Sequence, residues 1–344
     1  MAPSIFLTGG TGYIGGSVLA ALVKQHPKYD ITVLLRNVPD TFTSQYPNVK
    51  IVRGDFDDTA LIADTASKAD IVIHNGNSKH EPSIRAHIDG LLRNGTPSSP
   101  RFLIRLGGTG AIADWADPSY YGEKNPRVWN DIHDIEQLTS LPDTALHRNI
   151  EKIVQKAAVD HGDRLKCAII CSCGVYGPGK GPGRAQSQLV PLFCDEIINN
   201  TKRAFYTQSG GNARSWVHID DLVAVYIKLV EAAAAGGGNA DWGLHGYYFT
   251  ATQEVSQLDF ATAIGRILKK HGVIEYEEPV QLPLDDIWKT AQKSKWRYTG
   301  IYAFACNTRT VSARARKVLG YEPKAPSLFD CLEEDVLAAV RRGA

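Results

Sequence analysis

Short apolar runs alternate with amphipathic stretches over the first half of the chain. Near-continuous runs of Ile, Val, Leu and Phe predict strands at 4–9, 30–35, 69–75 and 101–108. The amphipathic stretches between them predict helices at 15–25, 59–67 and 82–94. Apolar strands that alternate with helices over short connections are typical of a parallel, doubly wound sheet covered on both faces. The predicted fold class is therefore α/β, with a Rossmann-type sheet.

The periodicity degrades between residues 111 and 143. Pro118, Pro126 and Pro142 interrupt this segment, and tryptophans and tyrosines are scattered through it. We expect a long loop with at most short helices, and long loops in compact domains are often functional. Regular patterns return beyond it, with a strand at 166–173 and helices at 145–162, 221–233 and 256–272.

Composition narrows the classes of function. The chain has 344 residues, 43% hydrophobic and 22% charged, with a formal net charge of +1, which favours neither a nucleic acid nor a membrane surface as partner. It has no apolar run long enough for a membrane span, and its first strand begins too early to leave room for a signal peptide. The six cysteines form no CxxC pair, so we expect buried free thiols, no metal site and a cytoplasmic protein, with disulfide or metal roles as alternatives.

The segment TGGTGYIGG, residues 8–16, carries the first chemical signal. Gly9, Gly12 and Gly15 form a G-x-x-G-x-x-G pattern between the first strand and the first helix. Glycines allow a phosphate to approach the backbone closely, and the helix N-terminus supplies free N–H groups and a positive dipole end. The pattern predicts a dinucleotide site, and the alternative is a tight turn without ligand.

The end of the second strand indicates which dinucleotide is bound. NAD sites usually present a carboxylate there for the ribose 2′-hydroxyl, whereas this chain reads VLLRN and places Arg36 at that point. A guanidinium suits a 2′-phosphate, which favours NADP(H) over NAD(H); the alternative is a solvated surface arginine. Asp55, after the third strand, is placed to reach the adenine amino group, although Asp57 and Asp58 are alternatively caps of the next helix.

Five segments recur together in one protein family: TGGTGYIGG, GDFDD (54–58), VIHNG (72–76), VYGPG (175–179) and RSWVHIDDL (214–222). In this order they resemble the extended and atypical short-chain dehydrogenase/reductases. The nearest branch is the nucleotide-sugar epimerases and dehydratases and, within it, a group of fungal paralogues. The resemblance covers nearly the whole chain.

The resemblance implies a Rossmann domain over 1–175, to which 214–235 returns, and a substrate lobe from 176–213 and 236–344. It also implies a homodimer, because relatives often pair through helices such as RNIEKIVQKAA (148–158). Together with the glycine loop, it gives as candidate cofactor-binding residues Thr8, Gly9, Gly12, Tyr13, Ile14, Gly15, Arg36, Asp55, Phe56, Asn75, Gly76 and His147.

The family's chemistry rests on a Ser or Thr after the fifth strand and a Tyr-x-x-x-Lys on the next long helix. Thr109 is the hydroxyl candidate here. Matching the segment EKIV to the family's helix places Asp143 where the tyrosine is expected and His147 where the lysine is expected. The usual pair is therefore absent.

Two substitutes are open. His147 can exchange a proton near neutral pH or donate to the nicotinamide ribose, with Asp143 orienting it one helical turn earlier. Alternatively, Asp143 is an N-terminal helix acid and His147 a partly exposed helix residue. A Tyr-x-x-x-Lys does occur at Tyr120 and Lys124, but the flanking prolines forbid a normal helix there. Tyr120 or Tyr121 reaching the cleft from the loop stays an alternative.

Tyr176 and Arg214 match segments that lead into the family's substrate lobe, and both are candidate substrate contacts.

Three candidate functions follow from these sequence patterns. The first is an NADP(H)-dependent oxidoreductase that acts on a small carbonyl, alcohol or activated double bond, with non-standard proton-transfer residues. The second is a redox-neutral epimerase, dehydratase or cyclase. The third is an NADP(H)-binding regulatory protein without turnover.

Overall fold

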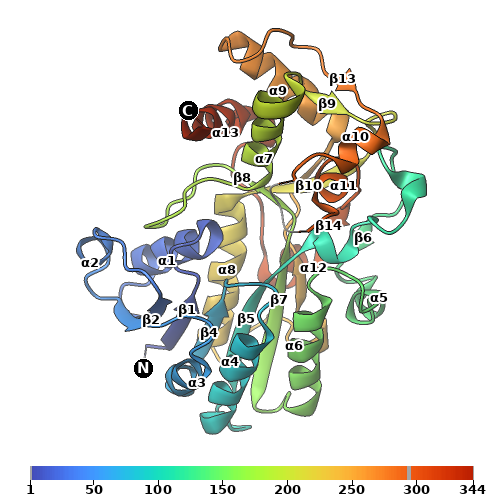
Figure 1. The fold of residues 1–344 in the computed structure, drawn as a ribbon. Helices are drawn as coiled ribbons and strands as arrows, with labels where there is room; N and C mark the ends of the chain where they lie inside the picture. Colours follow the sequence, from blue (N-terminus) through green and yellow to red (C-terminus); the bar gives the residue numbers. More distant parts are fainter. Residues whose placement is uncertain (1, 293–295, 344) are drawn as a thin grey trace.

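The computed structural model describes residues 2–292 and 296–343, and its lower half in Figure 1 is built around one parallel sheet. The seven strands of this sheet lie in the order β11-β7-β5-β4-β1-β2-β3. Their bounds are Tyr247–Phe249 (β11), Leu165–Ser172 (β7), Arg101–Gly108 (β5), Ile71–His74 (β4), Ser4–Thr8 (β1), Asp30–Leu35 (β2) and Lys50–Arg53 (β3). All neighbouring pairs are parallel.

Helices cover both faces of the sheet. Along β1, Ile5 and Leu7 pack into one buried cluster while Phe6 packs into another, because successive side chains of a strand point to opposite faces. The first face is covered by α1 (Tyr13–Gln25) and α8 (Ile219–Ala234), and the second by α3 (Thr59–Ser67), α4 (Glu81–Asn94) and α6 (Arg148–Asp160). The predicted doubly wound α/β fold is confirmed.

The upper half of the molecule in Figure 1 has its own buried cluster, rich in aromatic rings such as Phe193, Phe205 and Phe304. Its helices are α7 (Leu189–Glu196), α9 (Gln257–Lys270), α10 (Leu284–Trp288), α11 (Thr299–Phe304) and α13 (Leu328–Gly343). Its strands are β8 (Gly174–Tyr176), β9 (Phe205–Tyr206), β10 (Ala213–His218), β12 (Gln253–Ser256) and β13 (Val280–Gln281). The domain boundaries expected from the sequence stay a prediction.

The segment 111–143 is mostly irregular, as expected, but part of it is tied to the C-terminal region. It contains or adjoins the short helices η1 (Thr109–Ile112), η2 (Pro118–Tyr120) and α5 (Ile135–Thr139). It also contains β6 (Trp129–Asn130), which pairs with β14 (Thr310–Val311). The sequence did not predict this pairing, because a two-residue strand has no periodicity of its own. The other short elements are α2 (Phe42–Gln45), η3 (Ile197–Thr201), η4 (Gly243–His245) and α12 (Ala313–Leu319).

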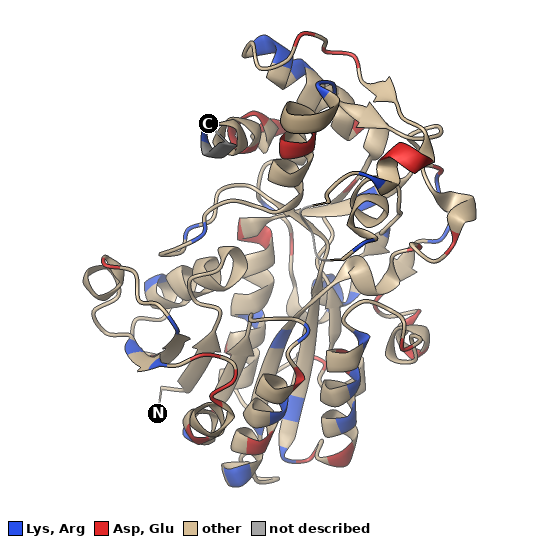
Figure 2. Cartoon of the chain, viewed as in Figure 1, with Lys and Arg blue, Asp and Glu red and all other residues tan. Residues whose placement is uncertain are grey.

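Charges of both signs are interspersed over the two halves of the molecule in the view of Figure 2. Of the six free cysteines, five are buried and Cys331 is half-buried. None of the helices in the described residues combines the length and apolar character needed to cross a bilayer. The same residues contain no group of three or more His, Cys, Asp or Glu side chains arranged to hold a metal ion.

One ion pair lies entirely inside the protein. Arg105 on β5 and Glu151 in the first turn of α6 are 1% and 0% exposed, with Nη1 and Oε1 3.7 Å apart. Arg105 is aligned with Ile169 on β7, which is aligned with Tyr247 on β11, so the three residues form a row across adjacent strands. The Tyr247 hydroxyl donates to Glu151 Oε1 at 3.4 Å. Burial raises the pKa of Glu151 to about 7, and the Arg105 charge opposes that rise.

We predict that Glu151→Ala lowers the free energy of unfolding by about 3–5 kcal/mol, because it leaves the Arg105 charge buried without an acceptor. The double variant Arg105→Met with Glu151→Met is expected to recover most of that loss, since both charges are then gone. Urea denaturation of the three proteins measures the difference.

The exposed pair of Asp64 on α3 and Lys68, the C-cap of α3, is a matched control, and Asp64→Ala is expected to change the stability little. If Glu151→Ala costs no more than Asp64→Ala, the buried pair does not hold β5 and α6 together.

Candidate cofactor and substrate site

The glycine loop has the backbone that its sequence requires. Gly9 has φ +78°, and a Cβ there would collide with the carbonyl oxygen of Asn75. A Cβ on Gly15 would collide with the carbonyl oxygen of Gly9. Gly12 is the N-cap of α1 and offers no side-chain cap. The loop therefore brings β1, the first turn of α1 and the end of β4 into close backbone contact, which no larger residue permits.

Polar groups around this loop are left free for a ligand. The first turn of α1 has no capping side chain, so its N–H groups and dipole face outward. Asn75 Oδ1 accepts a hydrogen bond of 2.6 Å from Tyr226, while Asn75 Nδ2 is buried without a partner among the described residues. Beneath the loop, Thr8 Oγ1 lies 2.8 Å from His74 Nδ1. An uncapped helix start, a glycine cradle and an orphaned amide donor fit the pyrophosphate and ribose of a dinucleotide.

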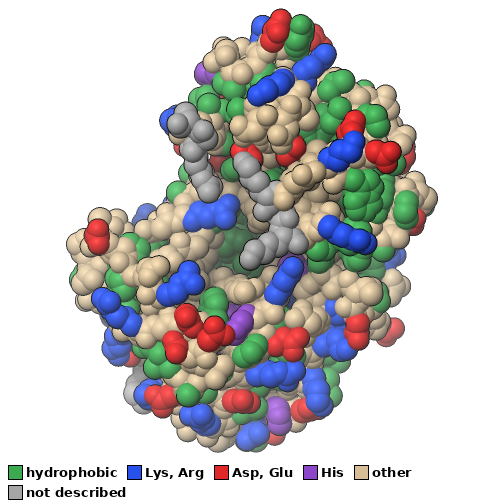
Figure 3. All heavy atoms as spheres, in the orientation of Figure 1, with side chains coloured by type: hydrophobic (Ala, Val, Ile, Leu, Met, Phe, Trp, Pro, Cys, Tyr) green, Lys and Arg blue, Asp and Glu red, His purple; other side chains and the backbone are tan. Residues whose placement is uncertain are grey.

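The loop opens into a cavity of about 480 Å³ between the sheet and the upper half of the molecule. Figure 3 shows the surface hollowed between these two parts. Backbone and side chains from both halves line the cavity, among them Gly12, Tyr13, Ile14, Gly15, Asn75, Gly76, Thr109, His147, Val175, Arg214, Thr299, Tyr302 and Ala303. A second, larger groove of about 790 Å³ lies away from the loop, between α4 and α6.

Thr109 and His147 lie together on one wall of the cavity. Thr109 is 2% exposed and follows two glycines at the end of β5. His147 Nε2 lies 3.5 Å from where a Cβ of Gly108 or of Gly110 would be. Burial, followed by the charges of Arg105 and Lys79, lowers the pKa of His147 to about 4. The imidazole is therefore neutral at physiological pH.

The expected arrangement of Asp143 and His147 on one helix is wrong. The helix begins at Arg148, and His147 is its N-cap with φ +68°, in the left-handed region. Asp143 lies before the helix and is exposed, and its carboxylate accepts bonds of 2.8 and 3.0 Å from Lys152. Asp143 is therefore paired with a lysine on the outside of α6 and does not orient His147.

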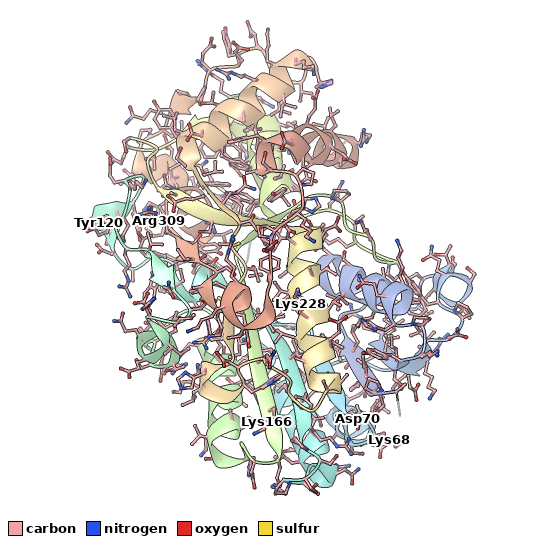
Figure 4. The ribbon with its side chains drawn as sticks, turned by 180° about the vertical axis from the view of Figure 1, so that it is seen from behind. Lys68, Asp70, Tyr120, Lys166, Lys228 and Arg309 are labelled. Carbon is pink, nitrogen blue, oxygen red and sulfur yellow. The ribbon has the colours of Figure 1, made fainter. Side chains whose placement is uncertain are left out.

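The two loop tyrosines do not line the cavity in the part of the chain that the structure describes. Tyr120 ends the short helix η2 and lies at the outer edge of the molecule near Arg309 in Figure 4. Tyr121 packs into the upper aromatic cluster and donates to the carbonyl of Trp115. Lys124 pairs with Glu254 at 3.7 Å. The structure therefore places this Tyr-x-x-x-Lys away from the cofactor loop.

The two candidate substrate contacts differ. Tyr176 is 1% exposed, and its hydroxyl donates to the Pro326 carbonyl and accepts from Gln253, so it is a core residue that does not reach the cavity. Arg214 does line the cavity. Its Nη2 donates to the carbonyl of Tyr302 at 2.7 Å, and its guanidinium lies 4.9 Å from the centre of the Tyr302 ring.

The adenosine end of the predicted site lies over the second and third strands. Arg36 directly follows β2 and is exposed. Leu35 before it is aligned with Arg53 at the end of β3, so two arginines end neighbouring strands. Asp55 accepts from the backbone N–H of Asp57. The Phe56 ring packs closely on Gly76, and a Cβ added to Gly76 would collide with that ring.

Sequence reasoning missed the contribution of α11. Thr299, Tyr302 and Ala303 all line the cavity, and their spacing of three and four residues places them on one face of this helix. The segment YTGIYAF (298–304) carries that spacing, but its pattern alone does not indicate which cavity the face meets.

Comparison with known proteins agrees with this site. Residues 1–90 match the NmrA-like family, and residues 144–243 match the NAD dependent epimerase/dehydratase family. An oxidase of an Acremonium species, ucsJ, is 30% identical over 345 residues, which cover 97% of this chain and 96% of that protein. The chain belongs to the extended short-chain dehydrogenase/reductase family. It is accordingly an NAD(P)-dependent enzyme, of oxidoreductase or epimerase/dehydratase type.

More distant relatives share the fold. The dTDP-glucose 4,6-dehydratase of Mycobacterium tuberculosis strain H37Rv is 22% identical over 67% of this chain and 70% of that protein. Among solved structures, UDP-glucose 4-epimerase from Thermotoga maritima with UDP-glucose has a TM-score of 0.65 at 16% identity, covering 99% of both chains. The dTDP-glucose 4,6-dehydratase of Bacillus anthracis in complex with NAD has a TM-score of 0.64 at 14% identity, covering 99% of this chain and 97% of that one.

We predict that Gly9→Ala weakens NADPH binding at least 10-fold, because the methyl group must displace the Asn75 backbone at the cofactor cradle. Fluorescence titration with NADPH measures the affinity. The matched control is Gly272→Ala, since Gly272 has φ +69° but nothing within 4 Å of its Cβ position.

Both substitutions are expected to cost about 1–2 kcal/mol of stability through the left-handed backbone. Only Gly9→Ala is expected to lose cofactor affinity. Equal NADPH affinity for the two variants would contradict the assignment of this loop.

Proposed function

We propose that this enzyme is an NADP(H)-dependent oxidoreductase that acts on a small organic carbonyl, alcohol or activated double bond. The observation that carries the proposal is the continuity of the site. An uncapped, glycine-cradled helix start leads directly into a 480 Å³ cavity whose walls bear a hydroxyl, an imidazole and a phenol.

Different residues would bind different parts of the cofactor and substrate. The first turn of α1 would hold the pyrophosphate through its free N–H groups, and Asn75 Nδ2 would donate to the cofactor beside it. When bound, the nicotinamide supplies or accepts a hydride, while the substrate oxygen gains or loses a proton. Thr109 and His147 supply hydrogen-bonding groups on the same wall of the cavity.

A preference for NADP(H) is supported by the ends of β2 and β3. Arg36 is exposed where a carboxylate would otherwise bind the ribose 2′-hydroxyl, and Arg53 ends the neighbouring strand. The Arg36 guanidinium favours a 2′-phosphate, because it supplies charge-assisted hydrogen bonds to the phosphate oxygens.

We further propose a small-molecule substrate, with neither nucleic acid nor membrane as partner, and a cytoplasmic location. A homodimer through α4 and α6 is supported by the groove that these two helices line, which has apolar residues such as Ile88, Leu92 and Ile153.

We predict that the protein binds NADPH more tightly than NADH and oxidises NADPH in the presence of at least one class of carbonyl acceptor. A suitable panel contains aliphatic aldehydes, cyclic ketones, α,β-unsaturated ketones and aromatic diketones, followed at 340 nm. Arg36→Glu is expected to weaken NADPH binding about 10- to 100-fold, since it removes bonds to a charged phosphate. NADH binding is expected to be unchanged or tighter, since the new carboxylate can accept from the ribose 2′-hydroxyl. Arg93→Glu, at an exposed arginine on α4, is the control.

Equal affinity for the two cofactors in the wild type would contradict the NADP(H) assignment. Tight NADPH binding without NADPH oxidation in the presence of any acceptor would contradict the proposed oxidoreductase function. Product formation from a substrate with no net change in NADPH would then indicate the redox-neutral alternative, and its absence the regulatory one.

A further inference from the structure

The C-terminal region places a phenol opposite His147. Tyr302 lies on the cavity-lining face of α11, from a part of the chain far from the glycine loop. The usual family tyrosine comes from the helix after β5, where this chain has Asp143, and the structure turns Asp143 outward. Tyr302 lies at the cavity with Thr109 and His147, whereas Tyr13, which also lines the cavity, donates its hydroxyl to the Gly177 carbonyl.

The distances define a small space between these groups. The position of a Cβ on Gly110 lies 3.4 Å from Tyr302 Oη and 3.5 Å from His147 Nε2. The two atoms are therefore at most about 7 Å apart. One oxygen that accepts two hydrogen bonds of about 2.8 Å spans up to about 5.6 Å, so a shift of at most about 1.3 Å lets both groups reach the same oxygen. Because residue 110 is a glycine, no side chain of its own fills the space.

Arg214 fixes the position of Tyr302. Its guanidinium donates to the Tyr302 carbonyl at 2.7 Å and lies over the ring, 4.9 Å from its centre. Arg214 is 7% exposed and lies on β10, which is hydrogen-bonded to β8 and β12. We therefore treat Arg214 as a positioning residue for Tyr302.

His147 offers a donor to the same space. Its Nδ1 is buried without a partner among the described residues, and a proton there would be an unsatisfied buried N–H. We assign the proton to Nε2, which faces the cavity. The neutral ring then donates a hydrogen bond without carrying a charge.

We propose that Tyr302 is the proton donor to the substrate oxygen and that the Nε2–H of His147 hydrogen bonds to that same oxygen. The inference rests on the proposed oxidoreductase function. In the reductive direction, the carbonyl carbon gains a hydride, and with it two electrons, from NADPH. The oxygen takes the proton of Tyr302, whose O–H bond breaks, and the phenolate regains a proton from water. In oxidation, Tyr302 first loses its proton to water; the phenolate then takes the alcohol proton as the carbon gives its hydride to NADP⁺.

The test compares Tyr302→Phe with Tyr298→Phe. Tyr298 lies four residues earlier and packs against Trp115 and Trp288, and it does not line the cavity. The probe reaction is reduction of 9,10-phenanthrenequinone by NADPH. Tyr302→Phe is expected to lower kcat about 10²- to 10⁴-fold, with NADPH affinity and thermal unfolding unchanged. Tyr298→Phe is expected to match the wild type. Retention of kcat by Tyr302→Phe would overturn the proposal.

A second readout needs no turnover. Proteins labelled with ¹³C at histidine Cε1 are compared by NMR without cofactor, and His147→Gln identifies the His147 resonance. Tyr302→Phe is expected to displace that resonance, and Tyr298→Phe is not. If the wild type does not reduce the probe, the proposed function fails for aromatic diketones. The NMR comparison alone then tests whether Tyr302 and His147 face the same space. A displaced resonance supports it, and an unmoved one overturns it.

Discussion

The buried pair of Arg105 and Glu151 is the interaction on which the geometry of the site depends. It joins the middle of β5 to the first turn of α6, with both side chains almost fully buried. The chain enters that turn through His147, a non-glycine residue with φ +68°, and a conformation of this kind persists only when its surroundings enforce it. The ion pair anchors Glu151, four residues later, to β5. It also keeps a positive charge near His147, which helps to hold the imidazole neutral.

The position of the site follows from the strand order. The chain winds from β1 toward β2 and β3 on one side and toward β4, β5 and β7 on the other. The direction therefore reverses between β1 and β4, and open α/β sheets bind ligands at such a point, beyond the carboxyl ends of the strands. The glycine loop follows β1, Asn75 follows β4, and Thr109 follows β5. The C-terminal region closes this edge with Arg214 and Tyr302.

The sheet and its helices could be predicted because each is a local pattern. The apolar runs predicted β1, β2, β4, β5 and β7 to within two residues at each end, whereas the three-residue strand β11 was not predicted. The glycine spacing identified the loop after β1. The start of α6 was predicted wrongly, because a left-handed N-cap at His147 and the pairing of Asp143 with Lys152 leave no trace in periodicity.

The places of Tyr176 and Tyr302 both depend on partners far away in the sequence. The hydroxyl of Tyr176 is bonded to Pro326, 150 residues away along the chain, which makes it a core residue. Tyr302 is held by Arg214 across a separation of 88 residues, which brings it to the cavity. Neither partner can be inferred from the surrounding sequence, so the glycine loop could be predicted and the places of these two tyrosines could not.

We propose that proton transfer comes from across the cleft rather than from the helix after β5. A crystal structure with NADP⁺ and an alcohol substrate tests it most directly, through the side chains that surround the nicotinamide C4 and the substrate oxygen. We expect Tyr302 Oη and His147 Nε2 within hydrogen-bond distance of that oxygen, and C4 within about 4 Å of the reacting carbon. A nicotinamide ring whose nearest hydroxyl is Tyr120 or Tyr121 would contradict it.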